Sequence, residues 1–338
     1  MNLVLPTPIK SPTISVVMPV YNSAEFLAES IESILAQSYN DFEFIILDDG
    51  STDQSREIIQ DYASKDIRIK THQNDCNKGI FFTRNLGLDK STGKYIAVMD
   101  ADDISMPDRF MKQVVFFDSH PDIDVLGGQI IKFGQAAQSG KKSNYPLTPG
   151  GVRWGLVSGC QLAHSTVMMR SHLFSVEGFQ YREFKVAQDY DLWTRLSPGH
   201  NIANLSDVLV QYRVHQSSIS GTNGLLQKHE TIRIIKEYVR NLSGINLPED
   251  IIKGLIASKD TRSVEDALLL SKLLLKLEKL TNSWELDRQE KSEINHQAAY
   301  KLNSICKHFN YHPRLFPVFL NSILLERKAW SFHRVNFL

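Results

Sequence analysis

The sequence Lys94-Tyr-Ile-Ala-Val-Met-Asp-Ala-Asp-Asp103 joins a run of five apolar or aromatic residues to three aspartates. A continuous apolar run of this length is typical of a strand buried on both faces of a parallel sheet. Side chains two positions apart share one side of an extended chain, so Asp100 and Asp102 are expected to reach a single ion. Unpaired carboxylates are costly to bury and must meet water, a metal or a cation. The stretch therefore predicts either a Mg²⁺ or Mn²⁺ site completed by substrate phosphate oxygens, or a solvated acidic turn.

The composition is that of a globular protein. The 338 residues can hold one large α/β domain and a smaller extension, and 42% hydrophobic and 22% charged residues are ordinary values. A formal net charge of zero gives no reason to expect nucleic acid as a partner. The cysteines, Cys76, Cys160 and Cys306, are scattered and odd in number, which favours reduced thiols. We find no apolar signal segment, and the stretch from Leu315 to Leu325 is too short to span a bilayer, so the expected location is the cytoplasm.

Strands and amphipathic helices alternate along the first part of the chain. Strands are predicted at residues 14–19, 42–48, 67–71, 95–99 and 125–131, and a capping box at 22–25 predicts the start of the first helix. This alternation predicts βαβ units and a mostly parallel central sheet with flanking helices. Ligands bind such sheets beyond the carboxyl ends of the strands. Three strand ends, at Pro19 to Asn22, Asp48-Asp49 and Asp100 to Asp103, therefore deliver polar groups to one edge.

The pattern becomes purely helical later in the chain. Residues 163–170 and 201–214 have strand character, and residues 187–196 suit a helix. After Gly224 only helices are predicted, the clearest of them beginning at Ser263-Val-Glu-Asp266. We predict a domain boundary near residues 221–224, with an all-α C-terminal extension after it.

Six motifs between Pro12 and Ser220, taken together and in this order, resemble the family-2 inverting glycosyltransferases of the GT-A fold. They are Val17-Met-Pro-Val-Tyr-Asn22, Asp48-Asp-Gly-Ser-Thr-Asp53, Asn77-Lys-Gly79 with Arg84-Asn85, Asp100-Ala-Asp-Asp103, Gln188-Asp-Tyr-Asp191 and Tyr212-Arg-Val-His215. The resemblance implies a Rossmann-like GT-A domain at 1–222 that binds a nucleotide-sugar and carries catalysis. The helical region, 223–338, lies outside the resemblance.

The resemblance implies an inverting, hexosyltransferase-type enzyme that depends on Mn²⁺ or Mg²⁺. Its donor would be a nucleoside-diphosphate sugar, by default a UDP-sugar. Its acceptor would be a hydroxyl of a glycan or a lipid-linked molecule in surface polysaccharide biosynthesis at the cell envelope. In such a reaction a general base removes the acceptor proton and the diphosphate leaves from the opposite face of the sugar.

Each motif implies a role for its residues. Pro19 and Tyr21 would flank the nucleotide base, and Asp49 would accept a hydrogen bond from base or ribose. Lys78 and Arg84 would face the diphosphate. The DXD-type motif would be Asp100-Ala101-Asp102, with the metal held by Asp100, Asp102 and His215. Asp189 matches the catalytic base, while Gln188 departs from the Glu that many members carry there.

Several of these residues have structural alternatives. Asp53 is most simply a helix N-cap, Lys78 could be a solvated loop lysine, and Tyr21 could be a core aromatic. His164 is either an acceptor-side group or a partly buried histidine with hydrogen-bond partners.

Two other functions are considered. A sugar-phosphate nucleotidyltransferase would carry a glycine-rich basic loop after the first strand, and Pro19 to Ala24 contain no Gly, Lys or Arg. A non-catalytic carbohydrate- or partner-binding protein would have lost the metal carboxylates or the base, and all of them are present.

Two aspartates compete for the role of base. Asp189 and Asp191 point about 200° apart on a helix, so they cannot both face one site. Asp191 precedes Arg195 by four residues, a spacing that favours an ion pair, and we expect Arg195 to lower the pKa of Asp191. Asp189 shares a face with Trp193, and a carboxylate beside apolar surface is partly desolvated and a better base. Asp189 is therefore the predicted base.

The last part of the chain combines basic and aromatic residues. After Tyr300 it has Lys301, Lys307, Arg314, Arg327, Lys328 and Arg334 against one acid, Glu326, together with Phe316, Phe319, Trp330, Phe332 and Phe337. This composition suits a helix on an anionic membrane surface, which would place the protein at the inner face of the membrane. The alternatives are packing on the catalytic domain, or a homodimer through the C-terminal helices.

Overall fold

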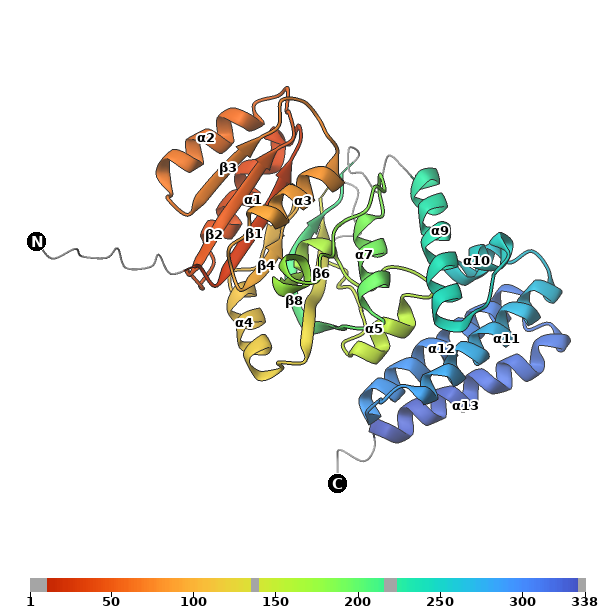
Figure 1. Cartoon of the computed structure of the whole chain (residues 1–338). Coiled ribbons are helices and arrows are strands. Elements are labelled where there is room, and N and C mark those ends of the chain that lie inside the picture. The colour runs from red at the N-terminus through yellow and green to blue at the C-terminus, as the bar shows by residue number, and fades with distance from the viewer. Residues whose placement is uncertain (1–10, 135–139, 216–223, 334–338) are drawn as a thin grey trace, which may run out of the picture.

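The computed structural model describes residues 11–134, 140–215 and 224–333, with side chains described as far as 329. Its centre is an eight-stranded sheet in the order β3-β2-β1-β4-β7-β6-β8-β5 (Figure 1). The first four strands are parallel neighbours: β1 (Ile14–Val20), β2 (Phe42–Asp48), β3 (Ile69–Gln73) and β4 (Tyr95–Val98). The strands β1 and β4 are completely buried, as their continuous apolar sequences require.

The second half of the sheet is mixed. It contains β5 (Ile104–Ser105), β6 (Ile123–Phe133), β7 (Met168–Arg170) and β8 (Asn201–Arg213). The short β7 is antiparallel to both β4 and β6, while β6 and β8 pair in parallel and β5 is antiparallel to β8. The predicted α/β fold with a mostly parallel central sheet is confirmed.

Helices cover both faces of this sheet, because alternate residues of β1 point to opposite sides. Ile14, Val16 and Met18 pack in one cluster with residues of α1 (Ala24–Leu35), α2 (Ser55–Lys65) and α4 (Arg109–Ser119). Val17 belongs to the other cluster, with α3 (Ile80–Lys90), α5 (Pro149–Gly155), α6 (His172–Ser175) and α7 (Gln188–Leu196).

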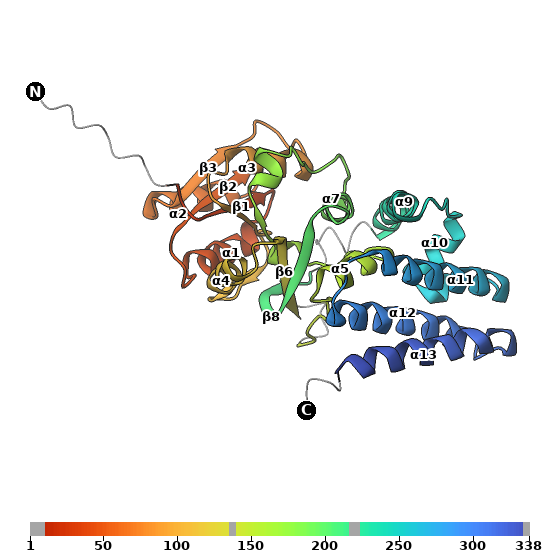
Figure 2. The same ribbon diagram turned by 60° about the horizontal axis from the view of Figure 1, so that its bottom comes forward.

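The C-terminal region consists of helices on the side of α5 and α7 (Figure 2), and their buried residues belong to this second cluster. They are α9 (Gly224–Ser243), α10 (Glu249–Ile256), α11 (Val264–Leu280), α12 (Arg288–His308) and α13 (Phe316–His333). As predicted, Ser263 caps α11, its hydroxyl accepting a hydrogen bond from the Asp266 amide. Within the part of the chain that the structure describes, every helix is too short or too polar to cross a bilayer.

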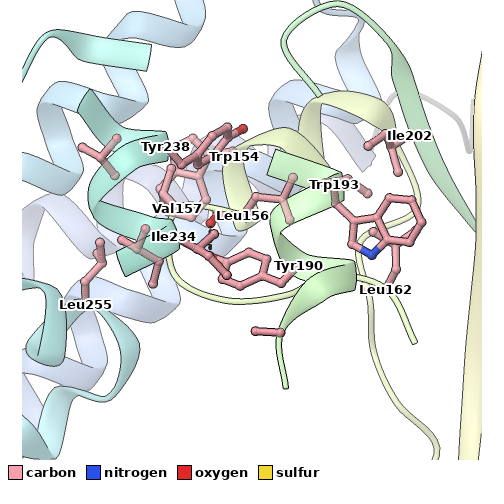
Figure 3. Packing of buried hydrophobic residues seen from close by; sticks show 14 of the residues in the cluster. Trp154, Leu156, Val157, Leu162, Tyr190, Trp193, Ile202, Ile234, Tyr238 and Leu255 are labelled. Carbon is pink, nitrogen blue, oxygen red and sulfur yellow. Dashed lines mark hydrogen bonds between the residues drawn. The ribbon is translucent and has the colours of Figure 1, made fainter. Parts of the chain in front are cut away.

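The helical region shares a hydrophobic core with the sheet region. Trp154, Tyr190 and Trp193 are buried in the same cluster as Ile234 and Tyr238 of α9 (Figure 3). Glu293 of α12 also accepts hydrogen bonds from the amides of residues 147 and 148, at 3.2 and 3.1 Å. The two regions are thus packed as one body, and the predicted division at 222/223 falls outside the described residues.

The last helix packs on its neighbour α12. The Ser292 hydroxyl donates to the Ala329 carbonyl at 3.1 Å, and the ring nitrogen Nδ1 of His296 lies 3.1 Å from Glu326. Phe316, Leu320 and Leu324 leave an exposed apolar stripe on α13. Membrane binding and dimerisation through these helices stay predictions, and Arg334, Phe337 and the side chains of Trp330 and Phe332 lie outside the described residues.

The start of the first helix differs from the expected capping box. Asn22 has a left-handed φ of 49°, and its side chain accepts from the Thr52 amide at 2.8 Å. The Ala24 amide instead donates to Asp53, whose other oxygen accepts from the Ser55 amide. One carboxylate thereby accepts from the first amide of both α1 and α2. The N-cap positions are Ser23 and Gln54, so the capping-box prediction is wrong, and Asp53 binds the start of α2 from the residue before its N-cap.

Candidate active site

The aspartate motif lies in a turn that follows β4. The strand ends at Val98, the chain turns at Ala101-Asp102, and the Asp103 amide approaches the Asp100 carbonyl at 3.5 Å. Ala101 is buried, and its carbonyl accepts from the Ser30 hydroxyl. The expectation that Asp100 and Asp102 extend from one side of a straight strand is therefore wrong. The turn places their carboxylates near one another by bending the chain, with different partners for each.

Asp100 is held by a cation and a hydroxyl. Its Oδ1 accepts from Arg84 Nη2 at 3.1 Å, and its Oδ2 accepts from Ser165 Oγ at 3.1 Å. His164 Nδ1 lies 3.7 Å from Oδ1. Burial alone would raise the pKa of Asp100, but His164, Arg84 and Ser165 together hold it well below its usual value. Asp100 is therefore ionised throughout the neutral range.

Asp102 contacts a different partner from Asp100. Its Oδ2 lies 2.9 Å from His215 Nε2, beyond the end of β8. Burial and the charge of Asp100 raise the pKa of Asp102. Two ligands at right angles and ~2.1 Å from one divalent ion are about 3 Å apart, so this pair fits a shared Mn²⁺ or Mg²⁺. Among the described residues, no three Asp, Glu, His or Cys side chains are already gathered as a closed metal cluster.

Beneath these two carboxylates lies a buried polar layer. Asp103 accepts from the Arg213 amide at 2.8 Å and approaches Ser165 Oγ at 2.5 Å. Burial and the charges of Asp102 and Asp100 raise the pKa of Asp103 strongly. The fully buried guanidinium of Arg109 donates to the carbonyls of Val98 and Val167, at 3.0 and 3.1 Å, and so joins the end of β4 to the residue before β7. Burial lowers the pKa of Arg109 to about 9, and the nearby acids oppose that shift.

Arg84 connects the aspartate turn with α7. Besides Asp100, it contacts Gln188 Oε1 through Nη1 at 3.3 Å. Gln188 Nε2 donates to the Phe184 carbonyl at 2.7 Å, which fixes the amide orientation. The Arg84 guanidinium also lies 5.6 Å from the ring centre of Tyr181. Gln188 is thus a neutral partner of Arg84, and Asp100 carries the charge that the cation meets.

The side chain of Asn85 fixes the backbone of Tyr181 by two hydrogen bonds. The side-chain amide of Asn85 donates to the Tyr181 carbonyl and accepts from the Tyr181 amide, both at 2.9 Å. The Tyr181 hydroxyl lies 2.9 Å from His164 Nε2. His164 is buried, so the expected partly buried histidine with a hydrogen-bond partner is found, while any contact with an acceptor stays a prediction. His164 Nδ1 and Arg84 Nε are buried without a hydrogen-bond partner in the described residues.

The two aspartates of α7 differ in their surroundings. Asp191 is buried and forms the predicted ion pair with Arg195 at 2.9 Å, with Arg182 at 3.6 Å. Its pKa is nevertheless raised, because desolvation by burial outweighs both arginines, so the expected lowering is wrong. Asp189 is half-buried in the first turn of α7. Burial and then the charge of Asp189 raise the pKa of Cys160.

The predicted nucleotide side of the edge is built around Asp49. Its Oδ1 accepts from Asn74 Nδ2 at 2.7 Å and from the Lys78 amide at 3.0 Å, while Oδ2 accepts from the Gly79 amide at 3.0 Å. Gly50 has φ +74°, and a Cβ there would lie 2.6 Å from the Cys76 carbonyl carbon. The loops after β2 and β3 are therefore in close contact, and the hydrogen bonds of Asp49 join one loop to the other.

The remaining predicted residues lie around these two loops. Tyr21 is 46% exposed just beyond β1, at the rim and outside the core, whereas Pro19 is buried within that strand. Lys78 is exposed, with its ammonium 5.1 Å from the ring centre of Phe82. Asp48 accepts from the Ser51 amide at 2.9 Å and closes the turn after β2.

Three contributors were not found from the sequence. Arg109 begins α4, Ser165 lies in the short 3-10 helix before β7, and Tyr181 lies between α6 and α7, so each reaches the site from a part of the chain distant from the aspartate motif or outside the strands. An arginine or serine on its own gives no functional signal. The sequence offers one hint for Arg109. It shares the buried face of α4 with Gln113, four residues later, although both side chains are polar.

Comparison with known proteins identifies the family. Residues 15–178 match the family described as Glycosyl transferase family 2. The protein EpsE of Bacillus subtilis (strain 168), named as a glycosyltransferase, is 37% identical over 211 residues, which are 61% of this chain and 74% of EpsE. The chain belongs to glycosyl transferase family 2. It is therefore a glycosyltransferase, and the two other functions considered from the sequence are set aside.

Solved structures extend the likeness in fold to most of this family-2 glycosyltransferase. S. aureus TarS 1–349 in complex with UDP-GlcNAc superimposes with a TM-score of 0.56 at 20% identity, covering 96% of this chain and 92% of TarS 1–349. The mannosyltransferase PcManGT from Pyrobaculum calidifontis, in complex with GDP-Man and Mn²⁺, gives 0.56 at 15% identity over 96% and 89%. These matches include the helical region and confirm the predicted GT-A fold with its helical C-terminal part.

Proposed function

We propose that this glycosyltransferase moves a sugar, with inversion, from a nucleoside diphosphate to an acceptor hydroxyl, with Asp189 as general base. The observation that carries the proposal is the bridging position of Arg84. Its guanidinium bonds Asp100 on one side and Gln188, the neighbour of Asp189, on the other. A cation between the two acidic motifs is suited to hold a diphosphate while the base faces the acceptor.

The metal would be held by Asp102 and His215, with Asp100 joining them. The 2.9 Å separation between Asp102 Oδ2 and His215 Nε2 suits two ligands of one ion, and the carboxylates suit Mn²⁺ or Mg²⁺. When bound, the metal would neutralise negative charge on the leaving diphosphate. A metal-bound mannosyltransferase of the same fold, PcManGT, supports this part of the proposal.

The chain's own residues would supply orientation and proton transfer. Asp49 fixes the loop that carries Lys78, and Lys78 and Arg84 would contact the diphosphate oxygens, while Tyr21 would cover the base. Asp189 would take the proton from the acceptor hydroxyl as that oxygen attacks the anomeric carbon and the bond from that carbon to the diphosphate oxygen breaks. No covalent enzyme intermediate is needed.

The donor is proposed to be a UDP-sugar and the acceptor a glycan or lipid-linked molecule in surface polysaccharide synthesis. TarS in complex with UDP-GlcNAc supports uridine, and PcManGT in complex with GDP-Man keeps guanosine as the second candidate.

Donor hydrolysis tests the proposal without knowledge of the acceptor. A panel of UDP-, GDP- and dTDP-sugars is incubated with the enzyme, with Mn²⁺, with Mg²⁺ and with EDTA. Release of one nucleoside diphosphate that requires the metal, and that Asp102→Ala removes, is the expected result. Equal release with EDTA would contradict metal dependence, and no release from any donor would contradict the proposed activity.

A further inference from the structure

We propose that the outer face of α9 binds a phosphate group carried by the acceptor. The proposal rests on the function proposed above, because it assigns a chemical class to that reaction's acceptor. Arg233, Lys236 and Arg240 are exposed at positions i, i+3 and i+7 of α9, so the three cations share one helix face. They line a cavity of about 190 Å³ together with Glu237 and Asn246.

The charge in this cavity is available to a ligand. None of the three cations has an acidic partner among the residues that the structure describes. The single acid that lines the cavity, Glu237, is already paired with Arg182 at 3.3 Å. The Arg233 guanidinium is positioned by the ring of Phe184, whose centre is 4.9 Å away. A convergent set of donors with surplus positive charge fits a phosphate, which accepts several charge-assisted hydrogen bonds.

The size of the cavity admits a phosphate group. Water occupies ~30 Å³ per molecule in the liquid, so 190 Å³ holds a phosphate with a few waters or part of a sugar. A membrane surface would call for apolar anchors beside the cations. Among the described residues of α9, the exposed large apolar side chain is Leu225, two turns before Arg233.

The cavity also lies next to the segment that leads to the proposed base. Phe184, which contacts Arg233, accepts the hydrogen bond that orients Gln188. Glu230, one turn before Arg233, accepts from the amides of Lys185 and Val186, both at 2.9 Å. In both views α9 runs beside α7, whose first turn carries Asp189 (Figures 1 and 2). A phosphate on α9 would therefore hold the acceptor on the side of the base.

The experiment uses the full chain and matched variants. One variant carries Arg233→Gln, Lys236→Gln and Arg240→Gln, and the control carries Lys272→Gln, Lys276→Gln and Lys279→Gln on the exposed face of α11. Each removes three charges. With UDP present in excess to fill the donor site, α-D-glucose 1-phosphate and inorganic phosphate are titrated into each protein by calorimetry. Vesicles of phosphatidylglycerol are tested by flotation, and melting temperatures establish that the variants are folded.

The wild type and the α11 control are expected to bind glucose 1-phosphate, and the α9 variant to bind it at least about tenfold more weakly, the loss of one average charge-assisted contact. Donor hydrolysis should be the same in all three proteins. Equal phosphate binding by the two variants overturns the proposal. Flotation that depends on the α9 cations, with no binding of either phosphate probe, also overturns it, in favour of a membrane surface. Absence of donor hydrolysis in the wild type contradicts only the proposed function.

Discussion

The sheet region and the helical region differ in the kinds of side chain that they bury. Below its polar edge the sheet region buries charged side chains, among them Asp48, Asp49, Arg84, Asp103 and Arg109. Among the described residues from 224 onward, the only buried charged residue is Glu230, and its carboxylate bonds amides of the sheet region. The comparison indicates that one region organises charge for a reaction, while the other supports it by apolar packing and by a few carboxylates directed at backbone amides.

The largest expected effect lies in the sheet region. Asp102→Ala should lower kcat/KM by about 10⁴ with the best donor, because several kcal/mol of metal stabilisation of the leaving group are lost. Its effect on the free energy of unfolding should be small, since Asp102 is half-buried with a raised pKa. Urea unfolding and donor turnover measure the two effects, with the exposed Asp118→Ala as the control. Near-normal turnover of the variant would remove Asp102 from the metal site.

Replacement of the base should separate binding from chemistry. Asp189→Asn should lower transfer by about 10³, within the range of general-base catalysis, while UDP binding measured by calorimetry stays unchanged. The partner variant Asp191→Asn should bind UDP and retain most transfer. If Asp191→Asn instead bound UDP and failed to transfer, the two roles would have to be exchanged.

The helical region is tested at Glu230. Glu230→Gln should destabilise the protein by about 2 kcal/mol, because one buried amide loses its acceptor and meets the new NH₂ group. It should also lower kcat, since residues 185 and 186 precede the proposed base. Urea unfolding and turnover are compared with Glu249→Gln, an exposed residue of α10. Loss of stability with unchanged kcat would show that Glu230 stabilises the fold and does not position the segment before Asp189.

The smallest effect is a pH dependence at Asp191. Burial raises the pKa of Asp191 above the ordinary 3.8, so its carboxyl ionises less readily in the folded state than in the unfolded state. The folded wild type therefore loses stability as the pH rises above 3.8. Asp191→Asn has no such cost. The variant should therefore be less stable than the wild type by about 1 kcal/mol near pH 4, where it loses a hydrogen bond with Arg195, with a smaller difference at pH 7. Unfolding free energies at both pH values test the sign, and a deficit that grows with pH would contradict it.

The fold could be predicted largely because its signals are local. Continuous apolar runs marked β1, β2 and β4, and Ser263 marked the start of α11. The order of polar strand ends then located the edge where Asp49, Asp100 and Asp102 lie, since parallel strands bring their carboxyl ends together. His215 was placed by resemblance to the family, and it does lie beside Asp102.

The site's detailed contacts depend on distant parts of the chain. Residues 100–103 form a turn because β4 ends where its neighbours β1 and β7 stop pairing with it, and neither neighbour is visible in the local sequence. Asn22 resembled a capping residue, but the first amide of α1 donates to Asp53, about thirty residues later. The sign of the Asp191 shift was missed because helical spacing reveals Arg195 and says nothing of burial.

The close contact at Gly50 constrains how this protein can change over evolutionary time or in a design experiment. A Cβ at that position would lie 2.6 Å from backbone of Cys76, and φ +74° is unfavourable for any residue with a side chain. Every substitution must move one of the two loops that Asp49 joins, and with them the backbone that carries Lys78. We therefore expect substitutions of Gly50 to weaken the proposed donor binding without a direct contact to the ligand, and libraries that vary donor specificity should leave it as glycine.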